Sequence, residues 1–403
     1  FCILLKFQWD AYRREEVSPN VFTLKLSATR ASERSDAFED KAEVNVTSRD
    51  SAIEIHVPDG GYLVKLKPGV SLVEGSWHKS QQLNADGLHV RLHLRVDQPS
   101  EALDSATVCL KALEKYHFLC QSCGAILVKE KVFRRVLPLP NGNWNALVDD
   151  WCCHPDPFAN KKLLPQEEDC LVGDTYFLLT RDSSCDNSLT QQIDSSCVNL
   201  DTSQYSVKQT AGCKNVVVFC KMCSAVLGEA VTSEVLKFYI TEVVIKQSEE
   251  REFTVPQHRQ QFLERALTSR LLELSSAQSI FRFSIQTPDC KSVIMLWLLN
   301  TDTLIASFSE KVTSSNGLIS SDRHLDEHQS CQAASAVKVL YLACNRAEHQ
   351  EAVDAWEKDI SVHPLALPWS TCDELLQLLS SCTSTLPPSL SSMNSYQVAY
   401  LKR

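Results

Sequence analysis

The chain has 403 residues, of which 44% are hydrophobic and 22% charged, a composition typical of a folded globular protein with two or three domains. The formal net charge of −10 argues against non-specific nucleic-acid binding by the whole surface, and no run of apolar residues is long enough for a membrane span. The 17 cysteines are irregularly spread, and the apolar start at residues 1–5 is too short for a secretory signal. We therefore expect a reducing compartment, the cytoplasm, with the nucleus as a second location.

The amino-terminal part is predicted to consist mostly of short strands. Residues 60–70 are rich in β-forming side chains between glycine and proline, and residues 87–96 alternate apolar with polar side chains. His89 and His93 lie on the polar face of the second strand, so we interpret them as solvated strand residues. The fold class is expected to be α+β, with a β-rich domain over residues 1–137.

Two segments 100 residues apart are near copies of each other. Residues 118–127 read FLCQSCGAIL and residues 218–227 read VFCKMCSAVL, so each has a Cys-x-x-Cys turn after an apolar run and before a small residue. Such a turn places two thiolates about one tetrahedral edge apart, and Zn²⁺ binds four. We predict one structural zinc, a split staple between distant parts of the fold, held by Cys120, Cys123, Cys220 and Cys223.

The long separation of the two motifs leaves alternatives open. Between Cys123 and Cys220 lie 96 residues, far more than in a compact zinc ribbon, so each pair could belong to a different site or remain a reduced dithiol. Gly124 suits a left-handed turn position, and Ser224 suits it less well. A redox role is not expected, because no βαβ pattern surrounds either copy.

Residues 138–174 form a segment in which several prolines interrupt regular structure. It contains four neighbouring residues, Trp151, Cys152, Cys153 and His154. Adjacent cysteines fit one tetrahedral ion poorly, but one thiolate or imidazole could reach a metal on another protein. A docking loop is one interpretation of this segment. The alternative is that the aromatic side chains fill a core and the cysteines are buried small hydrophobes.

The second Cys-x-x-Cys motif and its strands define the next predicted segment, residues 175–250. Residues 170–215 hold Cys170, Cys185, Cys197 and Cys213 in a polar stretch that resembles a variable loop. A strand region is expected over residues 234–246.

Residues 251–403 are predicted to form a mixed α/β carboxy-terminal region. Apolar residues recur at helical spacing over residues 262–274, a face that is expected to be core, with a partner-binding face as the alternative. Strands are expected at residues 279–286, 292–300 and 336–343.

A second chemical signal lies near the end of the chain. Thr371 and Glu374 have the spacing of a capping box, which predicts a helix that begins at Cys372. The helix dipole favours a thiolate at that position, whereas the neighbouring carboxylates oppose it. His349 and His363 are the nearest imidazoles along the chain. Cys372 is either a nucleophile for transthiolation or a cysteine packed under the helix start.

This segment resembles the catalytic-cysteine region of HECT-type ubiquitin ligases. The matching residues are Leu367-Pro368, Thr371-Cys372, Leu375 and Leu378, with the tail aromatic Tyr400. Two residues rather than the usual three separate Leu-Pro from Thr-Cys. With the two cysteine motifs and residues 151–160, most of residues 50–403 resemble HECT-like ubiquitin ligases that bind a ubiquitin-conjugating enzyme and are linked to mitotic cyclin.

The resemblance implies a ligase that accepts ubiquitin from a conjugating enzyme and transfers it to protein substrates or to itself, with Cys372 as the thioester nucleophile. It also implies cyclin B and the zinc-dependent endonuclease of pre-mRNA cleavage and polyadenylation as partners. Cys152 is the thiol that we expect to reach the zinc of that endonuclease. The alternative function is a non-catalytic protein that inhibits or chaperones the endonuclease through residues 151–158. No direct nucleic-acid or membrane partner is expected.

Overall fold

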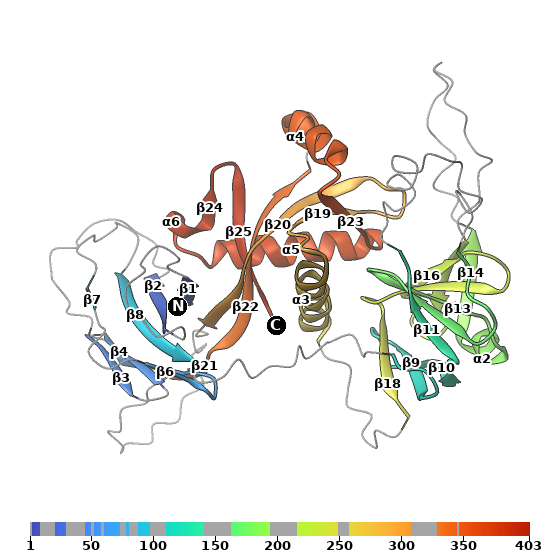
Figure 1. Ribbon diagram of the computed structural model, residues 1–403, viewed down its shortest axis with the longest axis horizontal. Helices are drawn as coiled ribbons and strands as arrows, with labels where there is room; N and C mark the ends of the chain where they lie inside the picture. Colours follow the sequence, from blue (N-terminus) through green and yellow to red (C-terminus); the bar gives the residue numbers. More distant parts are fainter. Residues whose placement is uncertain are drawn as a thin grey trace, which may run out of the picture. The chain divides into compact units, whose positions relative to one another are not determined.

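Strands make up most of the regular structure in the described part of the chain, and helices make up the rest. The computed structural model (Figure 1) describes residues 2–8, 21–29, 45–49, 52–57, 60–72, 78–79, 88–96, 110–140, 163–193, 216–248, 258–307, 329–344 and 346–403. These residues belong to two compact units, each assembled from separate stretches of the chain. The first unit comprises residues 1–103, 298–342 and 379–403, and the second comprises residues 104–297 and 343–378. The predicted four-part division of the chain stays a prediction.

The first unit is built mostly from antiparallel strands. Its elements are β1 (Cys2–Gln8), β2 (Val21–Thr29), β3 (Asn45–Arg49), β4 (Ala52–Val57), β5 (Gly60–Lys65), β6 (Val70–Leu72), β7 (His78–Lys79), β8 (Leu88–Val96), the end of β20 (Ser292–Ser307), β21 (Gln329–Gln332), β22 (Ala334–Ala343), α6 (Pro388–Ser391), β24 (Ser392–Met393) and β25 (Tyr396–Lys402). The larger sheet runs in the order β24-β25-β22-β20-β1-β2-β8-β6, and the smaller one in the order β21-β5-β4-β3.

Strand pairing in the first unit confirms two of the predicted strands. Within the stretch expected at residues 60–70, residues 60–65 form β5, which pairs antiparallel with β4, and the alternating stretch forms β8. Buried aliphatic side chains on facing strands, such as Ile53 opposite Val64, anchor this pairing.

The second unit combines further strands with most of the described helices. Its strands are β9 (Lys115–Cys120), β10 (Ile126–Val132), β11 (Arg135–Pro138), β12 (Asp169–Val172), β13 (Tyr176–Thr180), β14 (Leu189–Ile193), β15 (Val216–Cys220), β16 (Val226–Ala230), β17 (Val235–Tyr239), β18 (Val243–Gln247), β19 (Arg282–Gln286), the start of β20 and β23 (Val362–Ala366). Two sheets have the orders β10-β9-β18 and β11-β12-β13-β17-β16-β15-β14, and β19 pairs with both β20 and β23.

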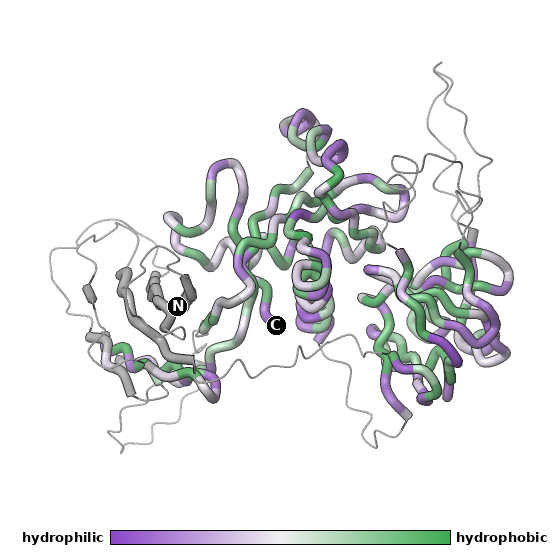
Figure 2. The backbone as a smooth tube through the Cα atoms, viewed as in Figure 1, coloured by the Kyte–Doolittle hydropathy of each residue, from purple (hydrophilic) through white to green (hydrophobic). Residues whose placement is uncertain are grey.

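An apolar core joins these two sheets of the second unit. Phe118 and Phe133 meet edge to face, with ring centroids 6.1 Å apart, and the side chains around them are buried. Figure 2 shows hydrophobic and hydrophilic residues interspersed along these strands. Cys170 and Cys185 lie in this core. The expectation of a variable loop is therefore wrong for residues 169–193, where cysteine acts as a small buried hydrophobe.

The described helices of the second unit are α2 (Ser183–Ser188), α3 (Arg259–Gln278), α4 (Arg346–Lys358) and the start of α5 (Trp369–Ser384). The predicted amphipathic helix is α3, and its apolar face is buried, including Leu263, Leu267 and Leu271. Among the helices in the described part of the chain, none is long and apolar enough to cross a membrane.

The predicted capping box at α5 is wrong. The helix begins at Trp369, so Thr371 lies inside the first turn rather than before it. The Thr371 hydroxyl donates a hydrogen bond of 2.6 Å to Glu242 instead of capping its own helix. Pro368 precedes the helix, and its carbonyl oxygen accepts the first helical hydrogen bond, from the Cys372 N–H.

Candidate metal centre and a buried cysteine

Both Cys-x-x-Cys motifs form the same turn at the end of a hairpin. In the first, the Cys120 N–H donates to the Ala125 carbonyl and the Gly124 N–H donates to the Cys120 carbonyl. Cys220, Ser224 and Ala225 repeat this pattern in the second. The residue after the second cysteine has a positive φ in both turns, 73° at Gly124 and 59° at Ser224. The repeated sequence therefore folds into a repeated local structure, which we call knuckles 1 (residues 120–125) and 2 (residues 220–225).

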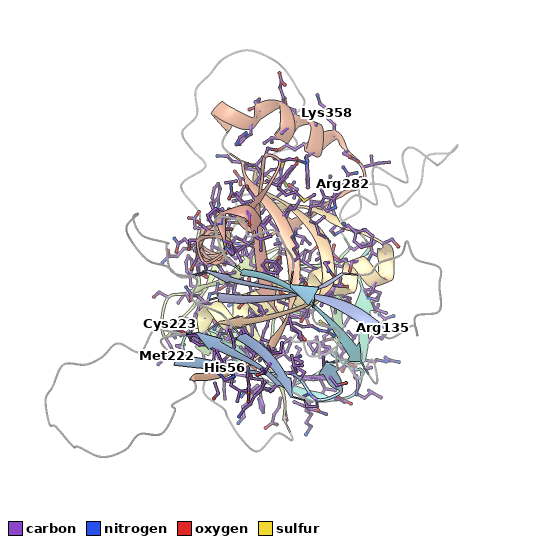
Figure 3. All side chains as sticks on the ribbon, turned by 90° about the vertical axis from the view of Figure 1, so that its left-hand side faces the viewer. His56, Arg135, Met222, Cys223, Arg282 and Lys358 are labelled. Atoms are coloured by element: carbon purple, nitrogen blue, oxygen red, sulfur yellow. The ribbon has the colours of Figure 1, made fainter. Side chains whose placement is uncertain are left out.

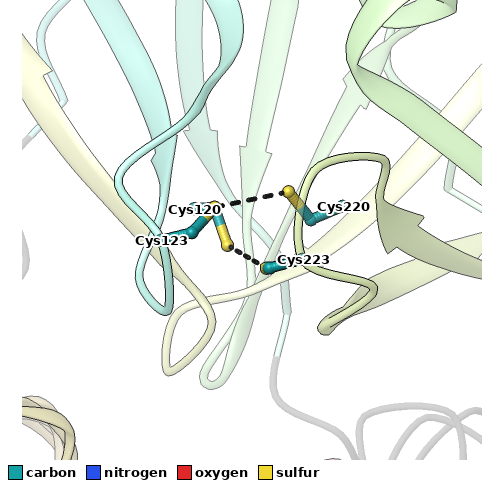
Figure 4. Close-up of side chains that lie close together, drawn as sticks. All are labelled: Cys120, Cys123, Cys220 and Cys223. Atoms are coloured by element: carbon teal, nitrogen blue, oxygen red, sulfur yellow. Dashed lines mark hydrogen bonds between the residues drawn. The ribbon is translucent and has the colours of Figure 1, made fainter.

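The two knuckles bring all four sulfur atoms together (Figure 4). The Sγ atoms of Cys120 and Cys223 lie 3.7 Å apart, as do those of Cys123 and Cys220, and all four lie within 4.8 Å of one another. A tetrahedron with Zn–S bonds of about 2.3 Å has edges of about 3.8 Å. The four cysteines are thus close enough to hold one metal ion.

The chemistry of this donor set suits a closed structural site. Four thiolates favour a soft or borderline ion such as Zn²⁺, and they leave no coordination position for a reacting water. Each Cys-x-x-Cys pair has one buried and one exposed cysteine, with Cys120 and Cys220 inside. Figure 3 shows Cys223 beside Met222, a residue that is 78% exposed. The cluster is therefore at the surface but shielded on one side.

The pKa values of these thiols depend on their burial and on the hydrogen bonds that they accept. Burial raises the pKa of Cys120 well above its usual range, and it also raises the pKa of Cys123. At Cys223 burial acts in the same direction, but hydrogen bonds from the Ala225 N–H and the neighbouring thiols lower the pKa overall. A metal ion must displace the protons of these thiols, so its binding competes with protonation.

A cavity of about 480 Å³ borders knuckle 1. Its walls come from both knuckles, from the turn before β18 and from the starts of α3 and α5, and they include Gln121, Cys123, Glu242, Arg259, Ser370 and Glu374. Arg259 donates to Glu242 at 2.8 Å and to Glu374 at 2.7 Å. No motif in the sequence predicts this network, because Arg259 is 17 positions from Glu242 and 115 positions from Glu374.

Cys372 lies in the first turn of α5 and is 1% exposed. Its Sγ contacts the carbonyl oxygens of Gln286, at 3.7 Å, and Leu367, at 3.8 Å. Burial, followed by the negative charges of Asp373 and Asp289, raises the pKa of Cys372 to about 12. The balance between helix dipole and desolvation therefore favours the neutral thiol.

The two histidines nearest to Cys372 along the chain have different positions. His363 is buried, its Nε2 lies 2.8 Å from Asp174, and its ring meets Phe283 edge to face. His349 lies in α4. The hydrogen bonds of Cys372 to described residues go to backbone carbonyls, and none joins it to an imidazole.

The part of the predicted docking loop that carries its four named residues lies outside the described residues. This applies to Trp151, Cys152, Cys153 and His154, so their role stays a prediction.

Known proteins are similar to this chain over most of its length. The family model described as HECT-like ubiquitin-conjugating enzyme (E2)-binding matches residues 16–398. The chain is 41% identical over 367 residues to a Homo sapiens protein named as an E3 ubiquitin-protein ligase, covering 89% of this chain and 91% of that protein. It is 41% identical over 359 residues to the Mus musculus protein of the same name, covering 89% and 90%. The Bos taurus protein is 40% identical over 368 residues, covering 91% and 93%. No solved structure matches the chain.

Proposed function

Because this chain belongs to the HECT-like ubiquitin-conjugating enzyme (E2)-binding family, we propose that it is a ubiquitin-protein ligase. It binds a conjugating enzyme that carries ubiquitin and promotes transfer to protein substrates or to itself. The observation that carries this proposal is the identity of about 41% with proteins named E3 ubiquitin-protein ligase over nearly nine-tenths of both chains.

Two chemical routes are open to such a ligase. In the first, the Cys372 thiolate attacks the thioester carbonyl of the charged conjugating enzyme, whose cysteine leaves as a thiolate, and a substrate amine then displaces Cys372. In the second, the substrate amine attacks the thioester on the conjugating enzyme directly. The closed position of the Cys372 thiol favours the second route unless the first turn of α5 opens.

A single-turnover discharge assay separates these routes. Charged conjugating enzyme is mixed with the wild type, with Cys372→Ser, or with Cys382→Ser as a control on the same helix, and the products are resolved without reductant. A reducible ubiquitin adduct that only Cys372→Ser abolishes establishes the relay. Discharge at an equal rate in all three proteins, with no adduct, establishes direct transfer. If the wild type neither discharges the conjugating enzyme nor ubiquitinates itself, the proposed ligase function is contradicted.

Zinc is the metal that we propose for the four-cysteine cluster. Its part is structural, because Cys120, Cys123, Cys220 and Cys223 complete a tetrahedral shell. Bound there, it would cross-link the β9–β10 hairpin to the β15–β16 hairpin and so support the surface beside the cavity.

The binding-module alternative remains a separate prediction for residues 151–158. A Cys152→Ala, Cys153→Ala double variant should lose co-purification of the pre-mRNA cleavage endonuclease if this loop docks it. Unchanged co-purification would remove the loop from that role. Cyclin B binding is likewise a proposal from family resemblance, and a cytoplasmic and nuclear location is a proposal from the cysteine usage of the sequence.

A further inference from the structure

Arg259 connects three elements of the second unit. It is the first residue of α3, and its guanidinium donates to the Thr241 carbonyl and the Glu242 carboxylate before β18. It also donates to Gln121 of knuckle 1, at 3.3 Å. The planar, five-donor guanidinium is the side chain that can satisfy so many acceptors at once.

The third connection holds the first turn of α5. Arg259 Nε pairs with Glu374 at 2.7 Å, and Nη2 donates to the Thr371 hydroxyl at 3.2 Å. Thr371 is completely buried and donates in turn to Glu242. The residues on both sides of Cys372 are thus hydrogen-bonded to one network, although Cys372 itself is not part of it.

This network has an open side. The cavity of about 480 Å³ is lined by Arg259, Glu242 and Glu374, and Glu374 is 40% exposed. A side chain of a bound partner can therefore reach the ion pairs without prior unfolding. Local opening of a few contacts is a far smaller change than unfolding of the unit.

We propose that Arg259, Glu242, Thr371 and Glu374 form a clasp that keeps the first turn of α5 closed over Cys372. In the closed state the clasp withholds the thiol, and disruption of the Arg259 ion pairs exposes it. The relevance of this device to ubiquitin transfer rests on the proposed ligase function. The clasp itself is a property of the folded chain and is tested without ubiquitin.

Site-resolved alkylation of the native, metal-loaded chain tests the clasp. The protein is pulsed with N-ethylmaleimide, digested with trypsin, and the Cys372 modification is followed in the peptide 359–402 by mass spectrometry. Cys382 lies in the same peptide and is an internal reference. Glu374→Gln removes one ion pair at a partly exposed position, so we expect Cys372 to react about threefold faster. Arg259→Lys loses the fork of donors, and we expect about a tenfold increase.

A matched control removes a carboxylate of similar exposure from α3. Glu273 is 53% exposed and pairs with Arg270, so Glu273→Gln should leave the Cys372 rate within about twofold of wild type. An unchanged Cys372 rate in both Glu374→Gln and Arg259→Lys overturns the clasp. A parallel increase at Cys372 and Cys382 also overturns it, since that pattern indicates general loosening. A selective increase at Cys372 supports the clasp even where the discharge assay shows direct transfer.

Discussion

The sulfur atoms of Cys120 and Cys223 lie 3.7 Å apart although the two residues are 103 positions apart in the chain. This contact, like the one between Cys123 and Cys220, joins the buried cysteine of one knuckle to the exposed cysteine of the other. The crosswise arrangement follows from two copies of one turn that face each other. An ion bound between them would link the two hairpins.

We predict that the purified chain binds one zinc ion per molecule with four sulfur ligands. X-ray absorption should show Zn–S distances of about 2.3 Å. Removal of the metal by a chelator should lower the melting temperature, because binding to the folded state alone stabilises it by mass action. Cys223→Ala should lower the metal content, whereas Cys290→Ala, at an exposed cysteine outside the cluster, should not. A wild-type protein without bound metal after expression with zinc would contradict this prediction.

One substitution in each knuckle turn should change the stability of the chain, and the two changes should have opposite signs. Ser224 adopts a left-handed conformation with a φ of 59°, so Ser224→Gly should stabilise the chain by about 0.5 kcal/mol. Gly124 has a φ of 73°, and Gly124→Ala should cost about 1 kcal/mol. Urea unfolding of metal-loaded protein measures both. If Ser224→Gly destabilises the chain instead, the contacts of the Ser224 side chain stabilise the fold by more than the left-handed backbone conformation destabilises it.

The knuckles could be predicted from sequence because they are local and repeated. The Cys-x-x-Cys spacing, the apolar entry and the small residue after the second cysteine specify one turn in each copy, and Zn²⁺ chemistry relates the copies. The convergence of all four sulfurs confirms that the two turns are neighbours.

The surroundings of Cys372 could not be predicted in this way. Thr371 and Glu374 have capping-box spacing, but both side chains bond to Arg259 or Glu242, partners distant in the sequence. Tertiary contacts therefore moved the helix start three residues earlier than expected, to Trp369. Desolvation of the thiol depends on the same contacts and has no local sequence signal.

Substitution of Gly228, near knuckle 2, is expected to destabilise the chain strongly. It faces Phe238 in the neighbouring strand β17, and a Cβ atom added to it would lie 1.7 Å from the Lys237 carbonyl oxygen. The backbone cannot move aside without breaking the β16–β17 pairing, so Gly228→Ala should cost about 3 kcal/mol. Gly69→Ala is the comparison, because that site has space for a Cβ but a φ of 80°, and about 1 kcal/mol is expected. Equal losses in the two variants would contradict the steric argument.

The buried thiol of Cys372 predicts a loss of stability at alkaline pH. Burial raises its pKa to about 12 in the folded chain, from 9.0 for an ordinary thiol. Below pH 9 both states keep the proton and the group has no pH-dependent effect on stability. As pH rises from 9 towards 12 only the unfolded state ionises, so stability falls. Between pH 7 and pH 10 this group alone should remove about 1.4 kcal/mol from the free energy of unfolding.

Cys372→Ala isolates this contribution from other titrating groups such as Cys170, whose pKa burial also raises to about 12. Urea unfolding at pH 7 and pH 10 should show a smaller decrease in the variant than in the wild type, whatever the variant's stability at pH 7. Cys170→Ala is the matched comparison, because Cys170 is a core thiol far along the chain from α5. This variant should reduce the loss of stability between pH 7 and pH 10 by a similar amount. If Cys372→Ala and the wild type lose equal stability, the thiol titrates normally, and Cys372 is open to solvent more often than its 1% exposure indicates. That outcome would mean that the clasp does not withhold the thiol from solvent, and the thioester route would be chemically accessible.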